Sequence, residues 1–327
     1  MDTRPLGTTG VDVTEVGLGT WQLGGDWGDV AASRARDALR AALDAGITFL
    51  DTADVYGDGR SERLVGEVLA ERDEAPFVAT KAGRQLDPHV ADGYTEANLR
   101  RFVDDSRERL GVDALDLLQL HCPPTDVYYR PETFEALATL REEGRIDHYG
   151  VSVERVEEGL KAVEYPGVET VQLIFNPFRQ RPREVFFREA AARDVGIIVR
   201  VPLASGVLTG ALSRDTEFPE NDHRNFNRGG EAFDVGETFA GVPYEQALDA
   251  ADAVEPLVPA GESMAQFTLR WILDHDAVST VIPGSTSPEH VRDNVAAAAL
   301  PRLAAERHAG VREVYDEFVR GHVHQRW

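Results

Sequence analysis

The sequence predicts an α/β fold: a closed (β/α)8 barrel of the TIM type, with an N-terminal β-hairpin, a long loop after the seventh strand and an extra C-terminal helix. Strand-like apolar runs alternate with amphipathic helical segments along the 327 residues, and eight such runs recur at a period of roughly 30–40 residues. A doubly wound sheet would show a glycine-rich turn after its first strand, but residues 17–21 (GLGTW) lack its third glycine. We therefore expect one barrel domain spanning residues 1–327.

The expected strands are short, apolar and without alternation, as is typical of parallel strands that are buried on both faces. They lie at 16–18, 48–50, 77–80, 115–119, 149–152, 170–173, 197–201 and 280–282.

The expected helices carry apolar stripes at helical spacing. Segment 95–110 shows the pattern best, because Thr95 can cap its start and Gly111 follows its end. Segments 33–45, 61–70, 131–143 and 264–275 follow the same pattern.

Three segments fall outside this repeat. The first dozen residues, with a turn-like GTTG at 7–10, predict a small hairpin that closes the barrel floor. A helix is expected from about 302 to 319, and His322 and His324 should lie in a solvated tail after it. Segment 205–244 follows the seventh strand and is longer than an ordinary loop, which indicates a functional role.

The charge balance excludes several classes of partner. The chain has 57 acidic against 34 basic residues, a net charge of −23, and such a surface repels nucleic acids and anionic membranes. No apolar stretch approaches 18 residues, so no membrane span is expected. The N-terminus does not resemble a secretory signal, and we expect a cytoplasmic protein that is a monomer or weak oligomer.

Cysteine and lysine are both scarce. Cys122 is alone, which excludes an internal disulfide framework and a thiolate zinc site, and no metal is expected. Only Lys81 and Lys161 are lysines, whereas the other 32 basic residues are arginines. Acidic excess with almost no lysine indicates a halophilic protein adapted to high intracellular salt, which screens charge repulsion. Each remaining lysine therefore calls for an explanation.

Titratable residues end three successive expected strands. Barrel active sites lie at the carboxyl ends of strands, and here these ends carry Asp51, Lys81 and His121, with Tyr56 on the loop after Asp51. A buried Lys81 next to Asp51 would be a paired charge, as burial requires. A cationic lysine beside a phenol lowers the pKa of the phenol, which makes Tyr56 a candidate general acid.

Around these residues, short motifs follow one another in a fixed order through nearly the whole chain. They are FLDTADVYG at 49–57, ATK at 79–81, SRERLGVD at 106–113, DLLQLH at 116–121, GVS at 150–152, VQ at 171–172, PLASG at 202–206 and IPGS at 282–285. Together they resemble the signatures of the aldo-keto reductase family. The chain looks closest to the bacterial-type general stress and aldose-handling branch, which shares the long segment after strand seven.

The resemblance implies an NAD(P)H-dependent oxidoreductase that transfers hydride between a nicotinamide and a carbonyl, aldehyde or aldose substrate. The resemblance implies a role for each of the four residues. Tyr56 would protonate the carbonyl oxygen, and Lys81 would lower the pKa of Tyr56. Asp51 would pair with Lys81, and His121 would donate a hydrogen bond to the substrate. No metal takes part. Two other readings stay open: a catalytically silent, cofactor-binding, redox-sensing regulatory subunit, and a lyase or isomerase with Lys81 as a Schiff-base former.

The resemblance also implies a cofactor site. Ser152 and Gln172 would hold the carboxamide, although Val153 replaces the usual asparagine. Arg200 replaces an aromatic residue that stacks on the nicotinamide, and its charge would disfavour the oxidised ring. The other implied contacts are Gly19, Thr20, Trp21, Pro202, Leu203, Ser205, Gly206, Leu208, Gly284, Ser285, Thr286, His290, Asp293 and Asn294.

Cofactor choice and substrate follow less directly. Most members of the family use NADP(H), which the resemblance therefore favours. NAD(H) stays open, because His290 stands where an arginine usually binds the 2′-phosphate. Ser285, Thr286 and the helix N-terminus can still hold phosphate. The partner is a small-molecule carbonyl or sugar. Aromatic residues that could line its pocket are Trp21, Trp27, Tyr128, Tyr129 and Phe226.

Overall fold

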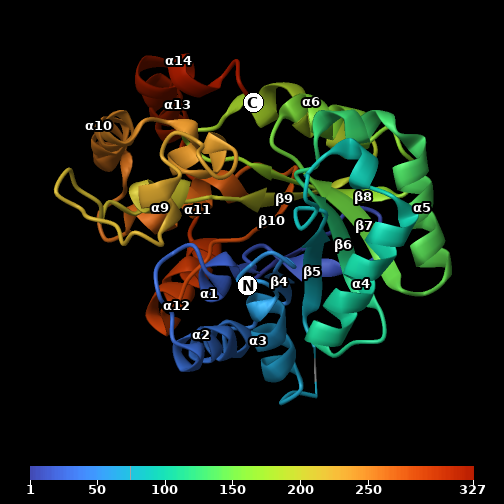
Figure 1. Ribbon diagram of the computed structural model, residues 1–327. Coiled ribbons are helices and arrows are strands. Elements are labelled where there is room, and N and C mark those ends of the chain that lie inside the picture. The colour runs from blue at the N-terminus through green and yellow to red at the C-terminus, as the bar shows by residue number, and fades with distance from the viewer. Residues whose placement is uncertain (74) are drawn as a thin grey trace.

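The chain forms a closed barrel, as predicted. The computed structural model describes residues 1–73 and 75–327. Eight parallel strands, β3 to β10, are hydrogen-bonded in chain order into one sheet. The bridges Val16 to Val281 and Gly19 to Gly284 join the two ends of the sheet. Figure 1 shows the strands at the centre and the helices around them.

Each barrel strand lies where the sequence predicts one, with ends that differ by a few residues. The strands expected at 149–152 and 170–173 change most in length, from four residues to seven, whereas in the first strand Val16 makes only an isolated bridge. The strands are β3 Leu18–Gly19, β4 Phe49–Asp51, β5 Phe77–Ala82, β6 Leu115–His121, β7 Ile146–Ser152, β8 Val168–Ile174, β9 Gly196–Arg200 and β10 Val278–Val281.

The helices confirm the predicted segments and add short ones. In the fourth helix Thr95 caps the start by accepting from the Asn98 N–H at 3.3 Å, and Gly111 ends it with a φ of 73°. The helices are α1 Trp21–Gly24, α2 Ala32–Asp44, α3 Arg60–Leu69, α4 Glu96–Leu110, α5 Pro131–Glu142, α6 Val156–Ala162, α7 Arg181–Val185, α8 Phe187–Ala191, α9 His223–Phe226, α10 Tyr244–Val254, α11 Met264–Leu273, α12 Pro288–Ala296, α13 Ala305–Val314 and α14 Arg320–Val323.

The predicted N-terminal hairpin consists of β1 (Thr3–Pro5) and β2 (Asp12–Thr14). Leu6 and Val13 of the hairpin are fully buried against interior residues of the barrel strands, among them Leu117. Arg4 donates to the main-chain carbonyls of Leu273 and Val278, both at 2.7 Å. These contacts lie at the amino ends of the strands, so the hairpin closes the floor of the barrel and leaves the opposite mouth open.

The long segment after β9 crosses that mouth. It contains short 3-10 turns, η3 (Ala204–Thr209), η4 (Val235–Glu237) and η5 (Phe239–Gly241), in addition to α9. The C-terminal residue Trp327 fastens it, because the indole N–H donates to Asp234 at 2.9 Å. Trp327 also stacks on the Arg179 guanidinium, 4.0 Å from the ring centroid.

The C-terminal region differs from the prediction in one respect. The expected helix is interrupted by a π-helical turn, η8 (Tyr315–Val319), and α14 continues to Val323. His324 is buried and bonds the Tyr315 hydroxyl at 2.8 Å, so the predicted solvated tail is wrong for this residue, whereas His322 is exposed as expected. Within residues 1–73 and 75–327, no helix is long and apolar enough to cross a membrane.

Candidate active site

A cavity of about 860 Å³ opens at the carboxyl ends of the barrel strands. Asp51, Tyr56 and His121 line it. Lys81 lies directly behind them and is fully buried. The structure therefore brings together all four residues predicted to be catalytic, because the ends of β4, β5 and β6 are neighbours in the barrel.

Lys81 connects two of these residues. Its Nζ donates to Asp51 Oδ2 at 2.6 Å, to the main-chain oxygen of Thr52 at 2.8 Å and to the Tyr56 hydroxyl oxygen at 3.2 Å. All three protons of the ammonium group are thus used. Since the phenol oxygen accepts from Lys81, its own proton is available to another acceptor in the cavity.

The environment decides which of these groups carry protons. Burial works against a charged Lys81, but Asp51 and Tyr56 outweigh it and raise the pKa of the ammonium group. Burial also raises the pKa of Tyr56, and Lys81 offsets only part of that rise. The expected lowering by Lys81 therefore exists but is the smaller effect, and Tyr56 is a protonated phenol at neutral pH.

His121 is held in its neutral form. Burial lowers its pKa well below the usual value, and the cations Arg84, Lys81 and Arg200 lower it further. Its ring stands edge-on to that of Tyr56, with the centroids 5.9 Å apart. A neutral imidazole carries one N–H, which can donate to an oxygen in the cavity.

A second set of side chains fixes Asp51 and extends the polar floor toward β8. Gln172 Nε2 donates to Asp51 Oδ1 at 2.6 Å, and Ser152 Oγ donates to Gln172 Oε1 at 3.2 Å. Thr20 Oγ1 donates to the main-chain oxygen of Asp51 at 2.9 Å. Ser152 and Gln172 thus lie next to each other and next to the Lys81–Asp51 pair.

Most, but not all, of the predicted cofactor residues reach the cavity. Thr20, Ser152, Leu208, Ser285 and Thr286 do not line it, and Thr20 supports Asp51 instead. Those that line it are Gly19, Trp21, Gln172, Arg200, Pro202, Leu203, Ser205, Gly206, Gly284, His290, Asp293 and Asn294.

The loop after β9 was expected to offer the Ser205 hydroxyl to a phosphate. In the structure this hydroxyl is already used, since it donates to the main-chain oxygen of Glu237 and accepts from the Phe239 N–H, both at 3.1 Å. Ser205 and Gly206 have φ values of 54° and 98°. The Ala204 and Gly206 N–H groups donate to the main-chain oxygens of Val201 and Leu203 at 3.2 and 2.9 Å, so the turn uses these donors internally.

An arginine that the sequence analysis did not single out lies near the expected 2′-phosphate position. Arg34, in the first turn of α2, donates from Nε to the main-chain oxygen of Thr286 at 3.0 Å. No carboxylate of the described residues 1–73 and 75–327 forms an ion pair with it. Its two terminal nitrogens are therefore available to an anion beside Ser285 and Thr286.

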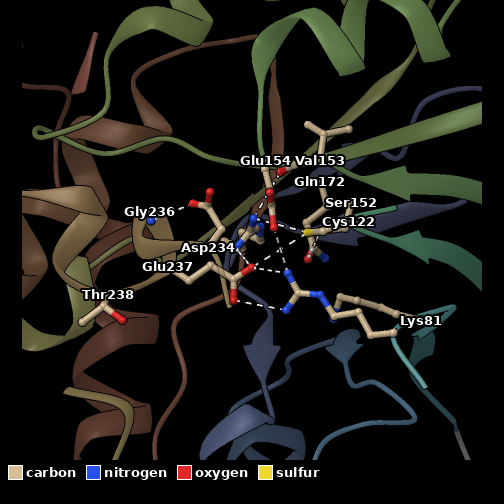
Figure 2. Close-up of polar contacts among 12 residues, drawn as sticks. Lys81, Cys122, Ser152, Val153, Glu154, Gln172, Asp234, Gly236, Glu237 and Thr238 are labelled. Carbon is tan, nitrogen blue, oxygen red and sulfur yellow. Dashed lines mark hydrogen bonds and ion pairs between the residues drawn. The ribbon is translucent and has the colours of Figure 1, made fainter. Parts of the chain in front are cut away.

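Arg200 is not an isolated cation. Its Nη1 lies 3.2 Å from Glu237 Oε1, and its Nη2 donates to the main-chain oxygen of Val153 at 3.1 Å. Glu237 also accepts from Arg84 at 2.7 Å, and Arg84 reaches Glu154 at 3.1 Å. Figure 2 shows Glu237 and Glu154 turned toward the same space beside Cys122.

The two carboxylates of this cluster differ in charge state. Burial opposes ionisation of Glu237, but Arg84 and Arg200 outweigh it and lower its pKa to about 2. The pKa of Glu154 is raised to about 7 by burial and by the neighbouring Asp234 and Glu237. Glu237 is thus a permanent anion, whereas Glu154 titrates near neutral pH.

Three potential metal ligands meet in this cluster. Atoms of Cys122, Glu154 and Glu237 lie within 4.8 Å of one another. A metal would have to displace two arginines from these carboxylates, and burial raises the pKa of the Cys122 thiol to about 11. The residues fit an ion-pair network better than a metal site.

Of the aromatic residues expected around a substrate, Trp21 and Trp27 line the cavity. The other three do not line it, because each side chain lies elsewhere. Tyr128 is fully buried, Tyr129 is 66% exposed at the surface, and Phe226 packs on the edge of Phe233 outside the cavity.

Several residues of the cavity wall had weak signals in the sequence. Arg84 and Glu154 follow the ends of β5 and β7 by two residues each, a position that could have suggested them. Phe233 and Glu237 lie in the long segment, whose length alone gave no hint of which side chains enter the cavity.

A buried carboxyl next to the site predicts a pH-dependent stability. Asp54 is fully buried, neither carboxyl oxygen has a partner in the described residues, and burial followed by Glu62 raises its pKa from 3.8 to about 7. Because the pKa of Asp54 is higher in the folded than in the unfolded chain, its protonated carboxyl stabilises the folded state fully at a pH below the unfolded-state pKa. This contribution to stability is lost as the pH rises toward 7. Between pH 5 and 7 the native chain should lose 1.36 kcal/mol per pH unit relative to Asp54→Asn, or about 2.7 kcal/mol, and little more from pH 7 to 8.

Urea unfolding at pH 5, 7 and 8 measures this difference. The exposed Asp58→Asn serves as the control and should follow the native pH profile. Parallel profiles for Asp54→Asn and the native chain would contradict the assignment.

The cavity suits a nicotinamide cofactor. His121 Nδ1 and Arg200 Nε are buried nitrogen atoms without partners among the described residues, and both residues line the cavity. Buried polar atoms of this kind usually meet a ligand or water. Asn294, Gly206 and Gln172, which the resemblance assigns to the cofactor, all line this one cavity.

Comparison with known proteins agrees with this geometry. The sequence profile of the Aldo/keto reductase family matches residues 15–316. The "uncharacterized oxidoreductase YqkF" of Bacillus subtilis is 31% identical, over 94% of each chain. A glycerol dehydrogenase structure from Gluconobacter oxydans is 29% identical, with a TM-score of 0.79 over 97% of this chain and 96% of that one.

A Klebsiella pneumoniae aldo/keto reductase structure, in complex with NADP and acetate, is 26% identical, with a TM-score of 0.68 over 93% of this chain and 92% of that one. The family profile, the fold and the order of the motifs agree over nearly the whole chain. The chain belongs to the aldo/keto reductase family of oxidoreductases, as its motifs predict.

Proposed function

We propose that this protein is an NADPH-dependent reductase of small aldehydes, ketones or aldoses, formed by residues 1–327 as one domain. The observation that carries the proposal is Lys81, which joins Asp51 to the Tyr56 hydroxyl at 2.6 and 3.2 Å beside the cavity. Such an arrangement serves to give a proton to a substrate oxygen.

The bound cofactor would supply the hydride to the carbonyl carbon. Tyr56 would donate its proton to the carbonyl oxygen, while Lys81 stabilises the phenolate that remains. The neutral His121 would donate its N–H to the same oxygen and stabilise the charge that develops there. Gln172, which lines the cavity, would hold the carboxamide, and Ser152 would orient Gln172 through its hydrogen bond of 3.2 Å.

The cofactor preference is assigned from the adenosine end. Arg34 brings a guanidinium to the Thr286 main chain, and α12 begins at Pro288 directly after it. A guanidinium and a helix N-terminus both favour a phosphate, which supports NADP(H) even with His290 in place of the usual arginine. The related structure from Klebsiella pneumoniae contains NADP. NAD(H) is the alternative.

Two other functions make different predictions. A regulatory subunit without catalysis would bind the cofactor but turn over no carbonyl. A Schiff-base enzyme needs an uncharged lysine, whereas Asp51 raises the pKa of Lys81 above its usual value. The geometry therefore favours the reductase over the Schiff-base enzyme, and turnover of a carbonyl separates the reductase from the regulatory subunit.

The test is a fluorescence titration with NADPH and NADH, followed by a panel of aldehydes, ketones and aldoses in molar KCl. NADPH should bind more tightly than NADH and be consumed with at least one carbonyl. Arg34→Ala should weaken NADPH by about tenfold and leave NADH unchanged, since it removes one phosphate contact. Binding of neither cofactor would overturn the proposal, and binding without any turnover would favour the regulatory subunit.

A further inference from the structure

We propose that Glu237 is the counter-ion of Arg200 and thereby sets the relative affinity of the site for the oxidised and reduced forms of the cofactor. This inference rests on the proposed function, because it concerns the cofactor of the same site. It assigns a role to a residue of the long segment after β9, which contains no predicted catalytic residue.

Arg200 lies where its charge would act on the nicotinamide ring. It ends β9, pairs in register with Ile174 two residues after Gln172, and lines the cavity with an unpartnered Nε. The guanidinium is charged at every accessible pH. The oxidised ring carries a positive charge and the reduced ring carries none, so an uncompensated Arg200 would oppose the oxidised form alone.

Glu237 supplies the compensating charge. Its Oε1 lies 3.2 Å from Arg200 and 2.7 Å from Arg84. Among the described residues it is the carboxylate that contacts both guanidinium groups, whereas Glu154 contacts Arg84 alone. Because Glu237 is 4% exposed and stays ionised, solvent screens its charge little.

The main chain holds Glu237 in this position. Ser205 Oγ donates to its carbonyl oxygen at 3.1 Å, and Asp234 caps the short turn by accepting from the Gly236 N–H at 2.6 Å. Figure 2 shows Asp234, Gly236 and Glu237 together at the edge of the cluster. The Glu237 carboxylate, which would act on the ring, therefore has a fixed position relative to the loop that would wrap the pyrophosphate.

The test compares the dissociation constants of NADP⁺ and NADPH, which need no turnover to be measured. In Glu237→Gln, which keeps the shape of the side chain, NADP⁺ should weaken by about tenfold more than NADPH. In Arg200→Gln the ratio should move the opposite way, and in the double variant it should return to within about twofold of the native value. Glu143→Gln is the matched control, since Glu143 also pairs with two arginines, Arg100 and Arg145, but on the surface.

The outcomes separate the two proposals. If Glu237→Gln weakens both forms equally, Glu237 only shapes the site and the counter-ion role is wrong. If that variant does not fold, an unchanged ratio in Arg200→Gln overturns the role just as well. A native chain that binds neither form would instead contradict the proposed function.

Discussion

Replacing Tyr56 by phenylalanine should lower turnover of an aldehyde by a factor of about 10²–10⁴, the usual contribution of a general acid. The substitution removes one hydroxyl group and keeps the ring, which packs beside Trp21 and lies 4.9 Å from Lys81 Nζ. The residues proposed to hold the cofactor are untouched, so NADPH affinity should stay within about twofold of the native value.

Single-turnover measurements with saturating NADPH would separate this chemical step from binding and product release. Tyr165→Phe is the matched control, because the Tyr165 hydroxyl bonds the main-chain oxygen of Tyr128 at 2.9 Å, away from the cavity. The control should keep native turnover. If Tyr56→Phe also kept it, the proton would come from another group and the assignment of Tyr56 would be wrong.

The fold could be predicted because periodicity and burial determine it locally. A strand buried on both faces needs a continuous apolar run, and in an amphipathic helix such as α4 the capping residues mark both ends in the sequence. The exact ends of the strands were harder to predict. Strand β5 continues through Lys81 to Ala82, where a charged residue would ordinarily end a buried strand, because the partner Asp51 comes from the neighbouring strand.

The same reasoning explains what could be predicted of the site. Asp51, Lys81 and His121 lie at or next to the carboxyl ends of successive strands, so the barrel brings them together whatever path the loops take. Glu237 could not be found this way, because its position depends on the path of a segment about 40 residues long that carries little regular structure.

Burial was the other quantity that the sequence did not reveal. Tyr128 and Tyr129 are neighbours in the chain, yet one is fully buried and the other faces solvent. For Tyr56, the neighbouring lysine was visible in the motifs, but the stronger effect of burial on its pKa was not.

The buried ion pair should be the most sensitive point for stability. Lys81 and Asp51 have side chains that are 0% and 3% exposed, and their charged atoms are 2.6 Å apart. Lys81→Met keeps most of the side-chain volume but leaves the Asp51 carboxylate without its cation. Breaking a buried pair in this way costs about 3–5 kcal/mol, and we expect the free energy of unfolding to fall by that amount.

Urea unfolding measures this loss, and the chain offers its own control. The only other lysine, Lys161, pairs with Glu164 on the surface at 2.5 Å, so Lys161→Met should leave the unfolding midpoint nearly unchanged. Asp51→Asn combined with Lys81→Met removes the stranded charge as well and should recover at least half of the lost stability. Equal midpoints for the two lysine variants would mean that water reaches the Lys81–Asp51 pair, and the buried-pair interpretation would then be wrong.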